Sequence, residues 1–252
     1  MLKKTNLVVI FLMAFILVFS ALKTPVMATG SVDNQIYATL LKKHVIAGRV
    51  NYDGLKTDEL LLDQYLEILS NTDIASLSKT AQFAFYINAY NAFTIKLILT
   101  RYPDLGSIKD LGGFLSSPWD IQFIRLQDKK ISLDMIEHDI LRPDFKDPRV
   151  HFAINCASKS CPPLHNEPYE PDRLEAQLDQ QARAFINAEN NFIIKGSQIS
   201  ISKIFKWFKG DFDDNPLKFI RAYASGNLKD ALESNSVITK INYLDYDWSL
   251  NN

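Results

Sequence analysis

Two cysteines and a histidine lie close together in the segment HFAINCASKSCPP, which starts at His151 and contains Cys156 and Cys161. We interpret residues 149–155 as a buried strand, because they are mostly apolar and a polar turn follows them. A strand that ends in a thiol fixes the position of the sulfur, and backbone N–H groups of the turn can bind a developing oxyanion. The pattern therefore indicates a candidate nucleophile at Cys156.

A cysteine attacks strongly only as its thiolate, so Cys156 requires a base or a cation nearby. His151 precedes Cys156 by five residues, and contact between them requires a bend or bulge at the end of the strand. His138 follows Asp134 by four residues on a predicted helix over 133–141, where the carboxylate would lie beside the imidazole. We expect His138 to be the closer partner if the strand is regular, and His151 if it is bulged. A surface or packing role is the alternative for His138.

The two cysteines also allow two other interpretations. If the protein is exported, an oxidising compartment favours a disulfide between Cys156 and Cys161. So short a loop gains only ~2 kcal/mol from closure, so such a bridge would serve shape or redox chemistry more than stability. Zinc could be held by His151, Cys156, Cys161 and His165, although these intervals fit no common zinc finger. Disulfide, reactive thiol and metal site all remain open on the spacing alone.

Two asparagines interrupt the apolar segment 79–99, which we predict to be a long central helix because apolar residues occur nearly all around it. Asn88 and Asn91 are three residues apart and share one face of that helix. An unpaired buried amide costs ~1–3 kcal/mol, so each side chain is expected to have a definite partner. That partner is a catalytic group or ligand in one interpretation, and a neighbouring loop in the other.

The N-terminal residues have the pattern of a secretory signal peptide. A short positive segment precedes an apolar run over 7–22, and small residues lead to a cleavage point after Ala28. We therefore predict that residues 1–28 are a signal peptide and that residues 29–252 form a single globular domain, secreted or periplasmic. An uncleaved membrane anchor is the alternative; after cleavage we expect no stable membrane span.

The composition excludes several classes of protein. The 252 residues are 47% hydrophobic and 23% charged, with a formal net charge of −1, which disfavours a disordered chain, a multi-span membrane protein and a nucleic-acid binder. The common signatures of serine hydrolases, nucleotide-binding proteins and zinc peptidases are missing, and no carboxylate pair stands out for glycoside hydrolysis. An aromatic cluster of Phe205, Trp207 and Phe208 is explained by core packing.

Helices dominate the predicted secondary structure. Helices are expected over 32–46, 58–69, 79–99, 133–141, 171–188, 203–208, 216–224 and 228–234. Hairpins are expected over 122–132 and 192–201, with further strands over 149–155 and 237–241. The predicted fold class is α+β, a helix-rich single domain with a small, mainly antiparallel sheet.

Several motifs resemble the family known as domain of unknown function 547. They are FYINAYNA from Phe85, IEH ending at His138, RVHFAINCASKSCP from Arg149 and SKIFKWFKGDF ending at Phe212. Together they cover most of residues 80–212, in the order typical of the family. The resemblance implies a shared fold rather than an established activity. It also implies that the motif positions of this chain are Asn88, Asn91, His138, His151, Asn155 and Cys156.

In plant relatives the position that matches Cys161 is commonly not cysteine, which makes an obligatory disulfide or zinc site less attractive. The preferred hypothesis is therefore an exported cysteine-dependent hydrolase or acyl-transfer enzyme of the peptidase or amidase kind. Cys156 would attack a carbonyl, with His138 or His151 as the base and Asn88 as an orienting residue.

Asn91, Asn155 and Ser158 are the expected binding residues of that enzyme. A peptide or amide is the candidate substrate class, and no cofactor, metal or nucleic-acid partner is expected. The alternative is a non-catalytic exported module that binds a ligand or a protein and is stapled by a Cys156–Cys161 disulfide.

Overall fold

A long central helix organises the N-terminal half of the protein. The computed structural model describes residues 30–113, 116–234 and 238–252, so the predicted signal peptide lies outside the described residues. Helix α4 spans Lys79–Leu99, as predicted, and its first turn is capped by Ser78, whose hydroxyl accepts a hydrogen bond from the Ala81 N–H. Residues on every side of α4 are buried, so other segments must cover it all around.

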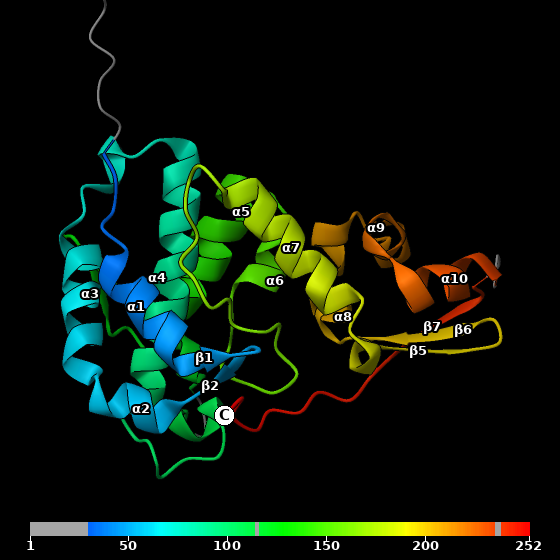
Figure 1. Ribbon diagram of the computed structural model, residues 1–252, viewed down its shortest axis with the longest axis horizontal. Helices are drawn as coiled ribbons and strands as arrows, with labels where there is room; N and C mark the ends of the chain where they lie inside the picture. Colours follow the sequence, from blue (N-terminus) through cyan, green and yellow to red (C-terminus); the bar gives the residue numbers. More distant parts are fainter. Residues whose placement is uncertain (1–29, 114–115, 235–237) are drawn as a thin grey trace, which may run out of the picture.

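Helices and short hairpins supply this cover (Figure 1). The first group is α1 (Gln35–His44), the hairpin β1 (Val45–Ile46) and β2 (Arg49–Val50), α2 (Tyr52–Thr57), α3 (Glu59–Asn71) and η1 (Ile74–Ser76). The second group is η2 (Ile108–Leu111), η3 (Pro118–Asp120) and the hairpin β3 (Ile124–Leu126) and β4 (Lys129–Ile131). The predicted hairpin over 122–132 and the predicted helix over 58–69 are thereby confirmed.

Three short helices follow the second hairpin: the π-helix η4 (Met135–Leu141), α5 (Arg142–Phe145) and α6 (Val150–Ala153). The predicted strand over 149–155 is wrong, because its first half is α6. The Asp147 carboxylate accepts a hydrogen bond from the Arg149 N–H at 2.9 Å, and Pro148 follows it, a combination that starts a helix. Because all residues of α6 are buried, apolar and polar positions do not alternate along it, and the hydrophobic pattern cannot distinguish a helix from a strand.

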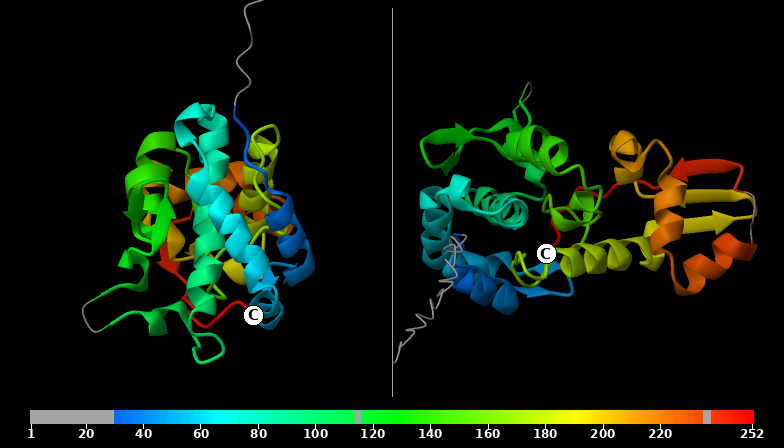
Figure 2. Two further views of the ribbon diagram at one scale, coloured as in Figure 1. Left: turned by 90° about the vertical axis from the view of Figure 1, so that its left-hand side faces the viewer. Right: turned by 90° about the horizontal axis from the view of Figure 1, so that it is seen from above.

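The C-terminal part builds a second hydrophobic cluster beside the first. It contains α7 (Leu174–Ile186), η5 (Glu189–Asn191), α8 (Ile204–Trp207), η6 (Lys209–Phe212), α9 (Pro216–Tyr223) and α10 (Gly226–Ser234). It also contains the sheet of β5 (Phe192–Lys195), β6 (Gln198–Ile201) and β7 (Lys240–Tyr243). Figure 2 shows that this sheet projects to one side of the helical body and that α7 runs from the body toward it.

The helix-rich α+β class is confirmed, but the strands are divided among three small sheets rather than one. The β5–β6 pair is antiparallel, as predicted, whereas β6 and β7 pair in parallel. None of the helices in the described ranges is long and apolar enough to cross a membrane.

The last residues of the chain cross back from β7 to the helical body, as the red segment of Figure 1 shows. The Leu250 N–H donates to the Gly106 carbonyl at 2.9 Å, and the Val50 N–H donates to the Asn251 carbonyl at 2.9 Å. The buried Tyr52 hydroxyl donates to the Asn251 side chain at 2.8 Å. These contacts hold residues 244–252 against the body and so fix the side chains that this segment contributes to the site.

Candidate functional site

A cavity of about 230 Å³ lies where the C-terminal segment meets η4, α6 and α8. All three tryptophans of the chain, Trp119, Trp207 and Trp248, line it. The other aromatic and polar residues on its wall are Tyr90, Ser117, Asp134, Glu137, His138, His151, Phe208 and Tyr246. Cys156 and Cys161 complete the wall, so the cavity brings together the predicted nucleophile and both predicted bases.

The tryptophans pack through Tyr246 into one aromatic wall. The ring of Tyr246 lies 4.8 Å from Trp207 and 4.5 Å from Trp248, between centroids, and Trp119 lies 5.7 Å from Trp248. Trp207 is 46% exposed and lines the cavity, so core packing does not account for it. Phe205, in contrast, is buried in the second hydrophobic cluster. The wall offers flat apolar surface to a ligand.

Cys156 and Cys161 form a disulfide, so neither cysteine of the chain is free. A bonded sulfur has no lone thiolate with which to attack a carbonyl. The free thiol expected at Cys156 is therefore not present in this structure, and a nucleophilic role remains a prediction for the reduced protein.

His138 is bound on both sides of its ring. Arg142 Nη1 lies 2.6 Å from His138 Nδ1, and because an arginine can only donate, Nδ1 is the acceptor. The proton of the imidazole then lies on Nε2, which is 3.4 Å from the Asp134 carboxylate, the neighbour that the i, i+4 spacing predicts. Since Arg142 occupies its basic nitrogen, His138 is not available to take a proton from a thiol in this arrangement.

His151 keeps one nitrogen unoccupied. Its Nε2 lies 2.7 Å from Asp211, while its buried Nδ1 has no hydrogen-bond partner within the described part of the chain. Burial lowers the pKa of His151 despite the nearby carboxylate, so the imidazole is neutral and donates its Nε2 proton to Asp211. The ring stacks on Phe208 with 3.9 Å between centroids. His151 is thus the predicted base whose basic nitrogen is free.

Asp211 joins the two histidines. It accepts hydrogen bonds from Arg142 Nε at 2.6 Å and from Arg142 Nη2 at 3.0 Å, in addition to the one from His151. The hydrogen bond from His151 and those from Arg142 hold the pKa of the Asp211 carboxyl well below its usual range, against the opposing effect of burial. The resulting chain of contacts runs from Asp134 through His138, Arg142 and Asp211 to His151.

Glu137 is an ionisable residue of the cavity wall that the sequence pattern did not single out. Burial raises the pKa of its carboxyl group to about 7, although hydrogen bonding to Tyr90 and the charge of Arg142 oppose the rise. The group therefore holds a proton for much of the time at neutral pH and can donate it to a ligand. A signal was present, because Glu137 lies four residues from both Leu133 and Leu141 and so falls on the apolar face of the predicted helix.

Asn88 and Asn91 tie α4 to loops and do not line the cavity. Asn88 donates to the Tyr169 carbonyl at 2.9 Å and accepts from the Tyr169 N–H at 2.8 Å. Asn91 donates to the Ala153 carbonyl at 2.9 Å and accepts from the Asn155 N–H at 2.8 Å. Asn88 therefore orients neither imidazole, contrary to the expected role, whereas Asn91 positions the chain just before Cys156.

Asn155 and Ser158 hold the disulfide loop. The Asn155 amide donates to the Pro162 carbonyl at 2.7 Å, and its oxygen accepts from the Ala157 N–H at 2.9 Å. The Ser158 hydroxyl lies 3.2 Å from the Cys156 sulfur. Both residues line a second cavity of about 360 Å³, whose wall also contains Cys161, so the disulfide borders two cavities.

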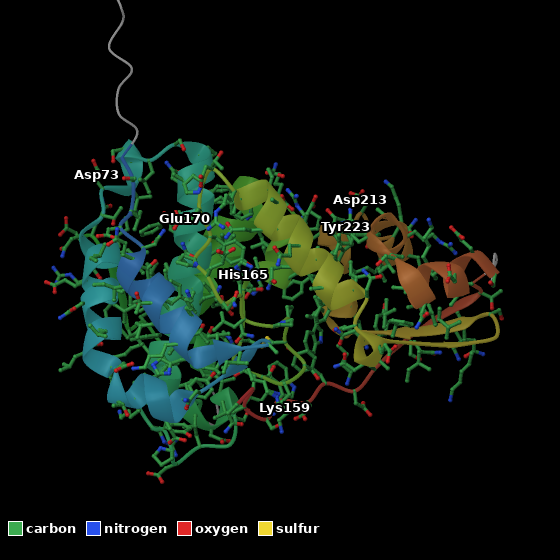
Figure 3. The ribbon with its side chains drawn as sticks, viewed as in Figure 1. Asp73, Lys159, His165, Glu170, Asp213 and Tyr223 are labelled. Atoms are coloured by element: carbon green, nitrogen blue, oxygen red, sulfur yellow. A yellow bond between two sulfur atoms is a disulfide. The ribbon has the colours of Figure 1, made fainter. Side chains whose placement is uncertain are left out.

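The zinc alternative lacks a ligand set. The two sulfurs are bonded to each other. His165, labelled in Figure 3, does not line the cavity; its Nδ1 lies 3.0 Å from the Glu167 carbonyl, and its ring packs beside Tyr169. Over residues 30–113, 116–234 and 238–252, no group of three or more histidines, cysteines, aspartates or glutamates is arranged to hold a metal ion.

Residues 74–186 match the family described as "Protein of unknown function, DUF547". The predicted family resemblance is thereby confirmed over these residues. The match covers Glu137, the two histidines and the disulfide, whereas Trp207, Tyr246 and Trp248 come from later residues. Neither the curated proteins nor the solved structures contain a match to the chain. The family description names no activity, so a function has to be argued from the cavity.

Proposed function

We propose that the protein is an exported binding module whose aromatic cavity takes a small, uncharged, amide-bearing ligand such as a short peptide. The observation that carries this proposal is the gathering of all three tryptophans of the chain on one cavity. Rigid aromatic side chains supply large contact area at low entropic cost, which is why binding surfaces are enriched in them.

The polar groups on the wall suit a neutral ligand better than an anion. A protonated Glu137 and the hydroxyl group of Ser117 can donate hydrogen bonds to a carbonyl oxygen. The carboxylate of Asp134 lines the same cavity and would repel an anion. An amide offers both a carbonyl acceptor and an N–H donor, so it can satisfy donors and acceptors of the wall together.

The disulfide supports the binding module over the thiol hydrolase in the oxidised protein, because neither cysteine has a free thiol. It also supports export, since disulfides persist in oxidising compartments and the first residues have the pattern of a signal peptide. Localisation outside the cytoplasm is part of the proposal.

Tryptophan fluorescence tests the proposal directly, because every tryptophan of the chain reports on the cavity. N-acetyl-L-phenylalaninamide should change the emission saturably, whereas N-acetyl-L-phenylalanine, which differs by carrying a carboxylate, should bind more weakly. Trp207→Ala should weaken binding of the amide about tenfold, as truncation of an aromatic contact residue commonly does. Leu60→Ala is the matched control, because Leu60 is 78% exposed and does not line the cavity. A linear, unsaturable response, or equal binding by the Trp207→Ala variant, would reject the proposal.

A thiol hydrolase that works after reduction is the second candidate. The observation that favours it is that Cys156 shares the cavity with His151, whose Nδ1 is unoccupied. Hydrolysis of N-acetyl-L-phenylalaninamide by the reduced protein, and its loss in Cys156→Ser, would support this candidate. If neither the oxidised nor the reduced protein hydrolyses the amide, the binding module remains as the one supported function.

A further inference from the structure

The Cys156–Cys161 disulfide is contacted by hydrogen-bond donors. The Tyr246 hydroxyl donates to the Cys161 sulfur at 3.3 Å and itself accepts from the Ser158 hydroxyl at 3.2 Å. The Cys156 N–H also donates to the Cys161 sulfur, at 2.9 Å. A neutral sulfur is a weak acceptor, whereas a thiolate gains strongly from such donors. The surroundings of Cys161 therefore favour the ionised, reduced sulfur more than the bonded one.

The Tyr246 hydroxyl is a dependable donor at neutral pH. Burial raises the pKa of Tyr246 to about 12, so the hydroxyl keeps its proton. Ser158 donates to Tyr246, whose hydroxyl lies 3.3 Å from both sulfurs, so this relay ends on the disulfide. The backbone N–H of Cys156 is a further, fixed donor that reaches Cys161 alone. Of the two sulfurs, Cys161 is thus the better leaving group.

The sulfurs can be reached from outside. Both cysteines are only partly buried, and both line the aromatic cavity. Cys161 also borders the second cavity, which contains Lys159 (Figure 3). Access of this kind is typical of reactive sulfurs, whereas structural disulfides are inert when they are buried.

The bridge is not needed to shape its loop. The Asn155 side chain donates to the Pro162 carbonyl, and the Cys161 N–H donates to the Ser158 carbonyl at 3.1 Å. The loop is also held from outside, because the Lys159 N–H donates to the Ser249 carbonyl at 2.9 Å. Since so short a loop gains little from covalent closure, opening the bridge should leave these contacts in place.

We propose that Cys156 and Cys161 are a redox couple that exchanges electrons with the thiols or disulfides of a peptide substrate. This activity goes beyond ligand binding in the cavity and requires only that a substrate sulfur reaches Cys156.

In the oxidising direction, a substrate thiolate attacks the Cys156 sulfur, a substrate–Cys156 disulfide forms, and the Cys156–Cys161 bond breaks. Cys161 leaves with the electron pair as a thiolate, stabilised by Tyr246 and the Cys156 N–H. A second substrate thiolate then attacks the substrate sulfur of the mixed disulfide. A substrate disulfide forms, and Cys156 leaves as a thiolate that takes up a proton. Two electrons thus pass from a substrate dithiol to the protein, and a substrate disulfide returns the protein to its oxidised state by the reverse steps.

The test uses the full mature protein, without denaturant, in mixtures of reduced and oxidised glutathione. Alkylation followed by intact-mass measurement counts the free thiols over time. We expect reversible conversion between zero and two free thiols, with the tryptophan emission and the thermal unfolding transition of a folded protein in both states. A disulfide that resists excess glutathione, or a reduced protein that unfolds, would assign the bridge a purely structural role.

Two variants test the role of Tyr246. Tyr246→Phe should slow exchange with glutathione roughly tenfold, because the hydrogen bond it removes acts on a charged sulfur. Tyr243→Phe is the matched control, since Tyr243 lies on β7 in the same segment and contacts neither sulfur by a hydrogen bond among the described residues. Equal rates in the two variants would contradict the assignment of Cys161 as the stabilised leaving group.

A thiol titration provides an independent readout. In Cys156→Ser, the remaining Cys161 thiol should ionise below the usual ~8.5, as followed by the ultraviolet absorbance of the thiolate. A normal or raised value would overturn the proposal. If Cys156→Ser does not fold, the exchange rates of the two tyrosine variants decide it, because both keep the disulfide.

Discussion

Asp211 and Arg142 form a two-point ion pair that connects η6 with the start of α5, with contacts of 2.6 and 3.0 Å. The same carboxylate accepts from His151, and Arg142 in turn donates to His138, so the ion pair connects two histidines of the cavity wall. The pair is partly exposed, which reduces its strength relative to a fully buried one.

Asp211→Asn should lower the free energy of unfolding by about 2 kcal/mol, because charge-assisted hydrogen bonds are lost and the buried His151 faces an amide. Urea unfolding at neutral pH measures the change. Asp245→Asn, which removes an exposed carboxylate with a single 3.5 Å ion pair to Lys203, should change the free energy little. Equal effects of the two substitutions would show that Asp211 does not organise the wall.

Glu137 should make the protein less stable as the pH rises. Its pKa is about 7 in the folded protein and near 4.5 when unfolded, so the folded state binds more protons between these values. The stabilisation is complete below pH 4.5 and is lost as the pH passes 7, a change of roughly 3 kcal/mol. Glu137→Gln should remove this part of the pH dependence, as unfolding at a series of pH values would measure.

Glu67→Gln is the control for that experiment, because Glu67 is exposed on α3 and should leave the pH profile unchanged. The lowered pKa of His151 acts in the opposite direction, because its contribution is lost as the pH falls below about 6.5. A Glu137→Gln profile that follows the wild type between pH 4.5 and 7 would mean that Glu137 is ionised in the folded protein at neutral pH.

Asn91→Ala should destabilise the protein by roughly 3 kcal/mol, because it leaves the Ala153 carbonyl and the Asn155 N–H without their buried partner. Thermal or urea unfolding gives the total cost. Hydrogen exchange should also become faster at the Asn155 amide, which shows that the loss is local to the disulfide loop. Asn190→Ala, which replaces an exposed asparagine of η5, should be nearly neutral.

Replacement of both cysteines by alanine should lower the free energy of unfolding by only ~2 kcal/mol, because the closed loop is short. The loop contacts of Asn155 should persist in that variant. Complete loss of folding would show that the bridge does more for the fold than its hydrogen-bonded surroundings indicate.

Local patterns predicted much of the secondary structure. The helix predicted over 79–99 has the ends that the structure shows. Ser78, which caps its start, and the Tyr102-Pro103 pair after its end mark these bounds in the sequence. Two of the three hairpins in the described residues were predicted from their turns, whereas the β1–β2 hairpin was not. The strand predicted over 149–155 is wrong, because a one-turn helix that is buried all around shows no apolar period. Asp147 and Pro148, just before this helix, are its start signal in the sequence.

The site was predictable only in part. The motif residues led to Cys156, His138 and His151, which the structure brings to one cavity. Trp248 and Tyr246 reach that cavity only because the chain crosses back from β7, which depends on the parallel β6–β7 pairing and on contacts far apart in sequence. Hydrophobic periodicity and residue spacing depend on neighbours in the sequence, so they could not predict that residues 244–252 pack against the helical body.

The central claim is that the cavity lined by the three tryptophans binds an amide-bearing ligand. Fluorine NMR of the protein labelled with 5-fluorotryptophan, titrated with N-acetyl-L-phenylalaninamide, tests it residue by residue. Our account predicts that the resonances of Trp119, Trp207 and Trp248 shift together and saturate at one common ligand concentration. Resonances that stay unchanged, or that shift without saturation, would contradict it.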